Sequence, residues 1–295
     1  MGKRIFLFAL TNAAILVLVG AILYFLNIGG LISGRGFMFY TGLMAVCLIW
    51  GMIGALISLA ISRWVAKWAM GVKLISKSAD DKRLRWVYET VERLTRQARI
   101  PMPEVGFYES DEVNAFATGP SKKKSLVAVS TGLLDSMGKN EVEGVLGHEI
   151  AHIANGDMVT MTLLQGVINA FVMFFARIIA WAVRLALDED YAWIVSFLVY
   201  ILMTILLSIL GSLVLAWFSR KREFIADSGG AEIAGRDKMI AALRALQSSV
   251  ELVDAKSSPT MNAMKISGKS RILAAFSTHP PLEKRIARLE GRERG

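Results

Sequence analysis

The sequence predicts a mostly α-helical membrane protein that carries an α+β domain with a small sheet. Three observations support this fold class: 54% of the 295 residues are hydrophobic, the apolar residues gather in long blocks, and two long hydrophilic stretches flank those blocks. A helix of about 20 apolar residues is long enough to cross the hydrocarbon core of a bilayer. We therefore expect about four transmembrane helices, formed by Ile5 to Leu26, Phe37 to Ile61, Met158 to Ala176 and Ala192 to Phe218.

The first apolar block follows Lys3 and Arg4, which is also the order found in cleaved signal peptides. The apolar core of a signal peptide is usually about 7–15 residues long, and this block is longer. A second apolar block begins soon afterwards. We therefore expect the first block to be a retained membrane anchor.

Charged residues between the apolar blocks predict the orientation of the chain. Basic residues precede the first block and follow the second and fourth, whereas the acidic residues 188–190 lie between the third and fourth. The positive-inside rule then places both termini and both hydrophilic stretches in the cytoplasm. Arg177 and Arg184 oppose this arrangement, so a third segment that enters the membrane without crossing it is an alternative. The basic residues in question are Lys3, Arg4, Arg63, Lys67, Lys73, Lys77, Arg220, Lys221 and Arg222.

The net charge of +9 is explained by this orientation and by attraction to anionic lipid. No basic stripe interleaved with aromatic residues accompanies the charge, so the lipid bilayer is an expected partner and nucleic acid is not. Cys47 is the only cysteine and lies inside an apolar block. An internal disulfide is therefore excluded, and a catalytic thiol is not expected.

The two hydrophilic stretches, 63–157 and 219–295, are together long enough for one compact domain. We expect residues 1–62 to form two transmembrane helices and 158–218 a transmembrane hairpin. Residues 63–157 would supply the cytoplasmic catalytic part, and 219–295 would complete the active site. Within the first stretch, apolar residues at helical spacing predict a helix over 80–100. Strands of a small sheet are predicted at Val105 to Tyr108, Ala115 to Thr118 and Leu126 to Ser130, with turns at Gly119-Pro120 and 121–124.

The most informative motif is His148-Glu149-Ile150-Ala151-His152. Residues i and i+4 share one face of a helix, so both imidazoles can bind one metal ion while the glutamate reaches a water beside it. A helix is favoured by Asn140 as N-cap with Glu143 three residues later, and by a stop at Asn155-Gly156. A chance match is the alternative, but two of the three histidines in the chain fall in this motif.

A catalytic zinc site needs a third protein ligand and one open position. Glu223 is the candidate, because Asp227 follows it at i+4 and could hold a histidine N–H. Two alternatives stay open for Glu223: an interfacial ion pair with Arg220 or Arg222, and His279 as the third ligand instead. His279 itself either precedes the start of a helix at Pro280-Pro281 or donates to a developing oxyanion.

Together these motifs, with Asn114-Ala115-Phe116-Ala117 and Thr278-His279-Pro280, resemble the HtpX family of bacterial membrane zinc metalloproteases over essentially the whole chain. These enzymes are gluzincins from the peptidase family that includes the CAAX prenyl endopeptidases. The resemblance implies one Zn²⁺ per chain in a cytoplasmic zincin-like domain. His148, His152 and Glu223 would be the ligands and Glu149 the general base, while Asp227 would support a ligand and His279 the transition state. Asn114, Ala115, Phe116 and Ala117 would form an edge strand that pairs with substrate; an ordinary core strand is the alternative.

The resemblance further implies proteolysis in membrane quality control and stress response. The substrates would be misfolded or damaged membrane proteins, cleaved from the cytoplasmic side of the bacterial inner membrane. One alternative is a selective processing protease that resembles the CAAX prenyl endopeptidases. Another is a membrane adaptor with structural zinc, which Glu149 argues against, since a structural site needs no general base. Imidazole and carboxylate ligands also suit other divalent ions, so the motif favours zinc without excluding them.

Overall fold

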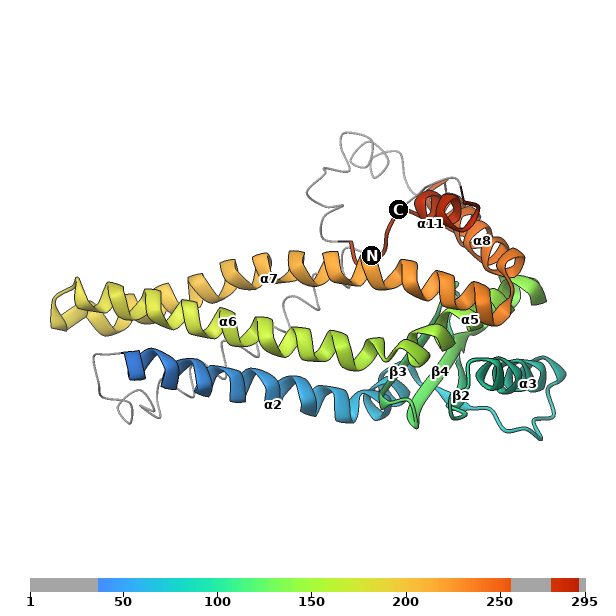
Figure 1. The fold of residues 1–295 in the computed structure, drawn as a ribbon, viewed down its shortest axis with the longest axis horizontal. Coiled ribbons are helices and arrows are strands. Elements are labelled where there is room, and N and C mark those ends of the chain that lie inside the picture. The colour runs from blue at the N-terminus through green and yellow to red at the C-terminus, as the bar shows by residue number, and fades with distance from the viewer. Residues whose placement is uncertain (1–36, 256–276, 292–295) are drawn as a thin grey trace. The chain divides into compact units, whose positions relative to one another are not determined.

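The computed structural model describes residues 37–255 and 277–291, so the predicted anchor at 5–26 lies outside the described residues. Helices dominate the described chain, and their order is drawn in Figure 1. The helices are α2 (Phe37–Met70), α3 (Lys82–Gln97), α4 (Thr131–Ser136), α5 (Lys139–Asn155), α6 (Asp157–Leu185), α7 (Glu189–Ala234), α8 (Arg236–Ala255) and α11 (Leu282–Leu289). The strands are β1 (Lys73–Leu74), β2 (Glu104–Tyr108), β3 (Ala115–Ser121) and β4 (Lys124–Ser130).

By its internal contacts the chain divides into two compact units. Among the described residues, one unit contains 37–57 and 161–217 with residue 277, and the other contains 58–160, 218–255 and 278–291. The chain therefore leaves the second unit after residue 160 and returns to it at 218. Two sequence-distant stretches consequently build one hydrophilic unit.

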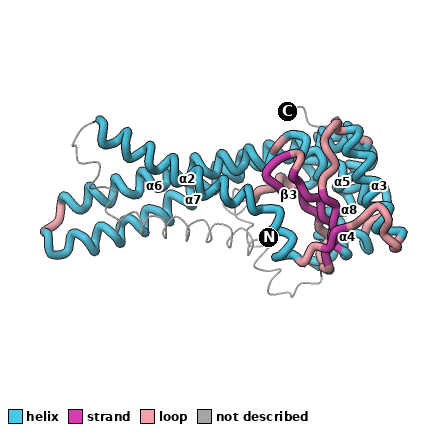
Figure 2. Tube along the Cα trace, turned by 90° about the horizontal axis from the view of Figure 1, so that it is seen from below, coloured by secondary structure: helices cyan, strands magenta, loops and turns pink. Residues whose placement is uncertain are grey.

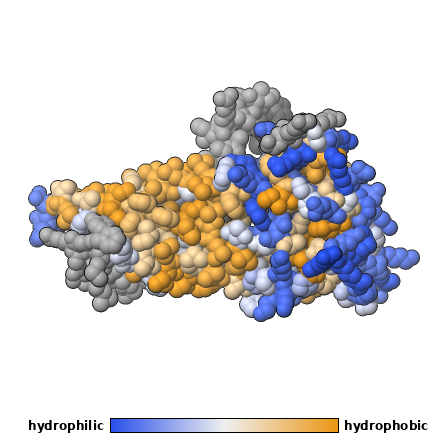
Figure 3. Space-filling view, in the orientation of Figure 1, coloured by the Kyte–Doolittle hydropathy of each residue, from blue (hydrophilic) through white to orange (hydrophobic). Residues whose placement is uncertain are grey.

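The first unit is formed by long apolar helices. Three helices in the described part of the chain, α2, α6 and α7, are long and apolar enough to cross a membrane. On the face drawn in Figure 3, hydrophobic residues predominate along these helices. Large exposed examples include Ile57, Trp193, Leu198 and Leu210. An apolar surface of this extent is unfavourable in water and is expected against lipid, which agrees with the predicted fold class.

The long helices extend beyond the predicted apolar blocks. The helix α7 runs for 46 residues without interruption, although its apolar block was predicted to end at Phe218. Glu223 and Asp227 therefore lie on the continuation of the fourth apolar helix rather than on a separate element. Because α7 is continuous, Glu223 and Asp227 have fixed positions on this one helix.

The second unit contains a four-stranded mixed sheet with the order β1-β2-β4-β3. Figure 2 draws the strands of this sheet in magenta. The strands β2 and β4 are parallel, and β3 pairs with β4 in antiparallel fashion. All three predicted strands are present, but Gly119 and Pro120, predicted as a turn, lie within β3. A register shift between Thr118 and Ser121 accommodates them, because an irregularity can take residues that do not fit a regular ladder. Within the described chain, β3 is an edge strand.

The helices α3 and α5 pack on this sheet through a shared core. Asp81 caps α3 by accepting from the backbone N–H groups of Arg83 and Leu84, and the predicted apolar face of α3 is buried. The core includes Val87, Val91 and Leu94 from α3, Val127 and Val129 from β4, and Leu146 and Ile150 from α5. Because Leu146 and Ile150 of α5 are buried in this core, the helix that carries the two histidines has a fixed position.

The sequence predicted the C-terminal end of α5 correctly and its N-terminal end incorrectly. The helix begins after Gly138, so the predicted N-cap at Asn140 is wrong. Glu143 makes no capping box; it pairs instead with Arg93 of α3 and Lys238 of α8. The C-terminal stop is confirmed, since Gly156 adopts the left-handed conformation with φ of 72° and donates to backbone carbonyls of α5.

Candidate metal centre

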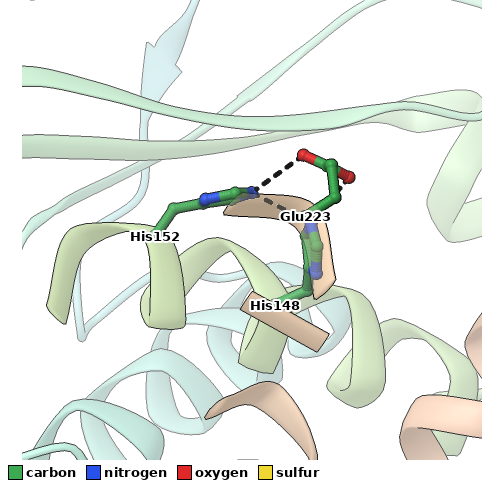
Figure 4. Close-up of side chains that lie close together, drawn as sticks. All are labelled: His148, His152 and Glu223. Carbon is green, nitrogen blue, oxygen red and sulfur yellow. Dashed lines mark hydrogen bonds and ion pairs between the residues drawn. The ribbon is translucent and has the colours of Figure 1, made fainter. Parts of the chain in front are cut away.

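Three side chains of the second unit converge on one point: His148 and His152 from α5, and Glu223 from α7 (Figure 4). The two Nε2 atoms lie 3.0 Å apart. Glu223 lies 3.6 Å from His148 Nε2 through Oε2 and 3.4 Å from His152 Nε2 through Oε1. One ligand atom from each residue falls within 4.8 Å of the others, so the three can surround a single ion. Two imidazoles and a carboxylate are the donor set of a catalytic zinc site.

Close helix packing brings Glu223 to the histidines. A Cβ added at Gly230 of α7 would lie 3.0 Å from the backbone nitrogen of His148. A Cβ added at Gly147 of α5 would lie 2.7 Å from the Cβ of Ala234. Because neither position has room for a side chain, the backbones of α5 and α7 approach closely. The motifs on the two helices therefore meet although they are far apart in sequence.

Asp227 holds the outer nitrogen of His148. Its Oδ1 lies 3.0 Å from His148 Nδ1, as the i+4 spacing from Glu223 predicted. Arg285 of α11 donates to both oxygens of Asp227, through Nε at 2.8 Å and Nη2 at 2.6 Å. Its Nη1 also lies 3.2 Å from Glu223 Oε2. Arg285 thus binds two buried carboxylates beside the metal ligands.

Opposite charges at the site stabilise one another. Burial alone would lower the pKa of His152, but the hydrogen bond with Glu223 and the charges of Glu149 and Glu223 outweigh it and raise that pKa. Burial would also lower the pKa of Arg285, yet its bonds and charge interaction with Asp227, together with the charge of Glu223, raise it. Burial alone would raise the pKa of Glu223, but the histidines hold it well below its usual range, so the buried charges of the site compensate one another.

His279 lies beside the three residues without joining them. Its Nδ1 is 2.7 Å from Glu223 Oε2, and its side chain is 48% exposed. The group that can surround an ion contains Glu223 and not His279, which favours Glu223 over the rival ligand. Pro281 is the N-cap of α11, so the histidine also precedes a helix start. The expected helix start is therefore present, and the oxyanion role of His279 stays a prediction.

The segment Asn114 to Ala117 leads into the edge strand β3. Asn114 donates its backbone N–H to Ser130 Oγ, and its carbonyl accepts from the Ser130 N–H. Ala115, Phe116 and Ala117 pair with β4. The opposite edge of β3 carries no strand among the described residues. Within the described residues, β3 is therefore an edge strand of the sheet, as predicted.

Sequence reasoning missed two residues at the site, Arg285 and Asp157. Arg285 comes from α11, and only the tertiary fold brings it to Asp227. Asp157 Oδ2 lies 2.6 Å from Nδ1 of His152. The position of Asp157, immediately after the helix stop at Gly156, was the one local signal that could have indicated it.

Comparison with known proteins agrees with these features. Residues 81–293 match peptidase family M48. The chain belongs to this family. It is 50% identical to a protein named Protease HtpX homolog from Bacillus subtilis (strain 168), over 99% of this chain and all of that protein. It is 48% identical to Protease HtpX of Idiomarina loihiensis, over 98% of this chain and 99% of that protein.

A solved structure, the crystal structure of S. mikatae Ste24p, shares the fold with a TM-score of 0.59 at 16% identity. The likeness covers 97% of this chain and 66% of the Ste24p chain. Membership of family M48, together with the apolar helices, identifies a membrane metalloprotease. The resemblance noted in the sequence is thereby confirmed. The convergence of His148, His152 and Glu223 is consistent with the divalent metal that the family implies.

Proposed function

We propose that this protein is a zinc endopeptidase that cleaves misfolded or damaged membrane proteins from the cytoplasmic side of the bacterial inner membrane. The observation that carries the catalytic part is the convergence of His148, His152 and Glu223 in a motif that also contains Glu149. When bound there, Zn²⁺ supplies a Lewis acid that lowers the pKa of water and polarises a peptide carbonyl. One such ion per chain fits the single group of ligands found in the described residues.

Glu149 is the proposed general base. It follows His148 directly on α5, and its negative charge contributes to the raised pKa of His152 and of Arg285. It would take a proton from the attacking water and deliver it to the leaving amine. His279 is half exposed beside Glu223, a position that supports its proposed role as a donor to the developing oxyanion. Asp227 would keep His148 in the tautomer that offers Nε2 to the metal.

Substrate would bind as an additional strand along β3. The residues Ala115, Phe116 and Ala117 already pair with β4 on one side, and β3 packs against the core that holds α5. Main-chain pairing fixes an extended peptide without selecting its side chains. Broad tolerance of sequence is what a quality-control protease requires.

The cytoplasmic orientation rests on the distribution of charge. Asp188 lies between α6 and α7, and Glu189 and Asp190 lie in the first turn of α7, whereas three basic residues follow the apolar part of α7: Arg220, Lys221 and Arg222. The positive-inside rule then puts the metal ligands on the cytoplasmic side. The division into two transmembrane parts and two catalytic parts is proposed on the same basis.

The test is zinc-dependent cleavage of an unfolded model protein by full-length protein in detergent. The protein is stripped by a chelator, supplied with Zn²⁺ and compared with Glu149→Gln. Cleavage by the unaltered protein alone supports the proposal. A zinc-loaded, folded protein that cleaves no substrate would contradict the proposed endopeptidase activity. Mapping of cleavage sites on several unrelated substrates separates broad quality control from selective processing, because a selective enzyme leaves most substrates intact.

A further inference from the structure

The two histidines of the metal site are held by different carboxylates. His148 is held by Asp227, the residue expected from the spacing to Glu223. His152 is held by Asp157, the first residue of α6, through a contact of 2.6 Å between Nδ1 and Oδ2. Asp157 is only 5% exposed. A carboxylate this deeply buried is stable only when ionic or hydrogen-bonding partners compensate for lost hydration.

Arg222 is the compensating partner of Asp157. Its Nη2 pairs with Oδ1, the carboxylate oxygen that does not face His152. Arg222 lies on α7 immediately before the ligand Glu223. The pair therefore joins the start of α6 to the turn of α7 that carries Glu223. Through Asp157 and Arg222, the start of α6 and this turn of α7 both lie beside the metal site, within the hydrophilic unit.

We propose that Asp157 is a positioning residue for His152, and that Arg222 holds Asp157 in place to do so. The inference rests on the proposed metal site, which it extends outward from the ligands. Because the Asp157 carboxylate accepts the hydrogen bond, Nδ1 carries the proton and donates it, and Nε2 presents its lone pair toward His148 Nε2 and Glu223. Loss of the carboxylate would free the ring to rotate and to change tautomer.

A purely structural role for Asp157 has to be separated from this positioning role. An acidic residue in the first turn of a helix is stabilising by itself, because it faces the positive end of the helix dipole. Asp81 offers a matched control, since it caps α3 by accepting from backbone N–H groups and belongs to no metal site. Asp157→Asn and Asp81→Asn both remove a negative charge at a helix start and keep a side-chain oxygen there, but only the first touches a ligand.

The experiment measures Zn²⁺ affinity of chelator-stripped, full-length protein in detergent by competition with a chromophoric chelator. We expect Asp157→Asn to weaken zinc binding by about 10–100-fold, the usual effect of losing a carboxylate behind a ligating histidine. Asp81→Asn should leave zinc affinity unchanged and alter the melting temperature only slightly, because asparagine also caps helices well. The visible spectrum of the Co²⁺-loaded protein gives a second measure, because its bands follow the geometry of the ligands.

Arg222 is tested through a double-mutant cycle. Arg222→Gln should weaken zinc binding, Arg222→Lys should restore part of it, and Arg220→Gln, which removes the same charge two residues away, should not weaken it. If Arg222 acts through Asp157, adding Arg222→Gln to Asp157→Asn causes no further loss. These single variants also keep the test usable if Asp157→Asn does not fold.

Two outcomes overturn the proposal, and they differ in what else they remove. Unchanged zinc affinity and an unchanged Co²⁺ spectrum in Asp157→Asn would show that Asp157 serves only the helix start, while the metal site stands. Equal zinc affinity in His148→Ala and in the unaltered protein would show that zinc binds elsewhere. The proposed metal site and the role of Asp157 would then both fall.

Discussion

His148 and His152 lie one helical turn apart, yet the fold supports them in different ways. His148 is held by Asp227 and Arg285, and those two residues are 58 positions apart in the chain. His152 is held by Asp157, only five positions away, with Arg222 behind it. Arg285 also reaches Glu223, whereas the described contact of Arg222 is with Asp157 alone. The support of His148 thus depends on docking of the C-terminal helix α11, and that of His152 on the junction between α5 and α6.

Glu149→Gln should produce the largest effect while leaving both supports intact. The amide cannot accept the proton of the attacking water, so we expect cleavage to fall by about 10²–10⁴-fold. Zinc content and melting temperature should not change, because Glu149 is not one of the converging ligands. Glu141→Gln, on the same helix, is the control. Retained cleavage in Glu149→Gln would assign the base to another residue.

Glu223→Ala should remove metal binding, because this residue stands between the two histidines and is the only carboxylate of the group. We expect zinc affinity to fall by more than the roughly 10–100-fold that loss of a supporting partner causes. Metal content after dialysis against zinc measures the change. His279→Ala should keep the metal and lose cleavage. The opposite pattern, with metal lost only in His279→Ala, would move the third ligand to His279.

The two supports should respond unequally to loss of their arginines. The Arg285 side chain is 6% exposed and that of Arg222 is 19% exposed. Removing one partner of a buried ion pair destabilises a fold by about 3–5 kcal/mol. We therefore expect Arg285→Gln to lower unfolding free energy and zinc affinity more than Arg222→Gln does. Denaturant unfolding of the metal-free protein measures the first, with Lys284→Gln at an exposed position of α11 as control. Equal losses would make the two supports equivalent.

The sequence predicted those parts of the site that depend on local spacing. The i, i+4 pairs His148 with His152 and Glu223 with Asp227 needed only the helical repeat, and the structure places each pair on one helix. The contribution of Arg285 could not be predicted, because it depends on where α11 docks. The N-cap at Asn140 was wrong for a related reason. Tertiary ion pairs with Arg93 and Lys238 take the Glu143 carboxylate that a capping box would have used.

That tertiary role of Glu143 leads to the smallest predicted effect. Burial alone would raise the pKa of Glu143, but the hydrogen bonds and charges of Lys238 and Arg93 outweigh it and lower that pKa. A folded-state pKa below the unfolded value means that the carboxylate stabilises the fold above about pH 4.3. This stabilisation is lost as the pH falls through the folded-state pKa.

Glu143→Gln should therefore cost about 1 kcal/mol at pH 7, in the range of partly exposed ion pairs. The difference from the unaltered protein should shrink as the pH falls below about 4.3. Melting curves of both proteins between neutral and acidic pH measure this, and the exposed Glu89→Gln on α3 shows the effect of charge alone. Glu143 lies on α5 apart from both histidine supports, so zinc affinity should stay constant. A loss of zinc affinity in Glu143→Gln would mean that the position of α5, and not only its two carboxylate partners, limits how the histidines hold the metal.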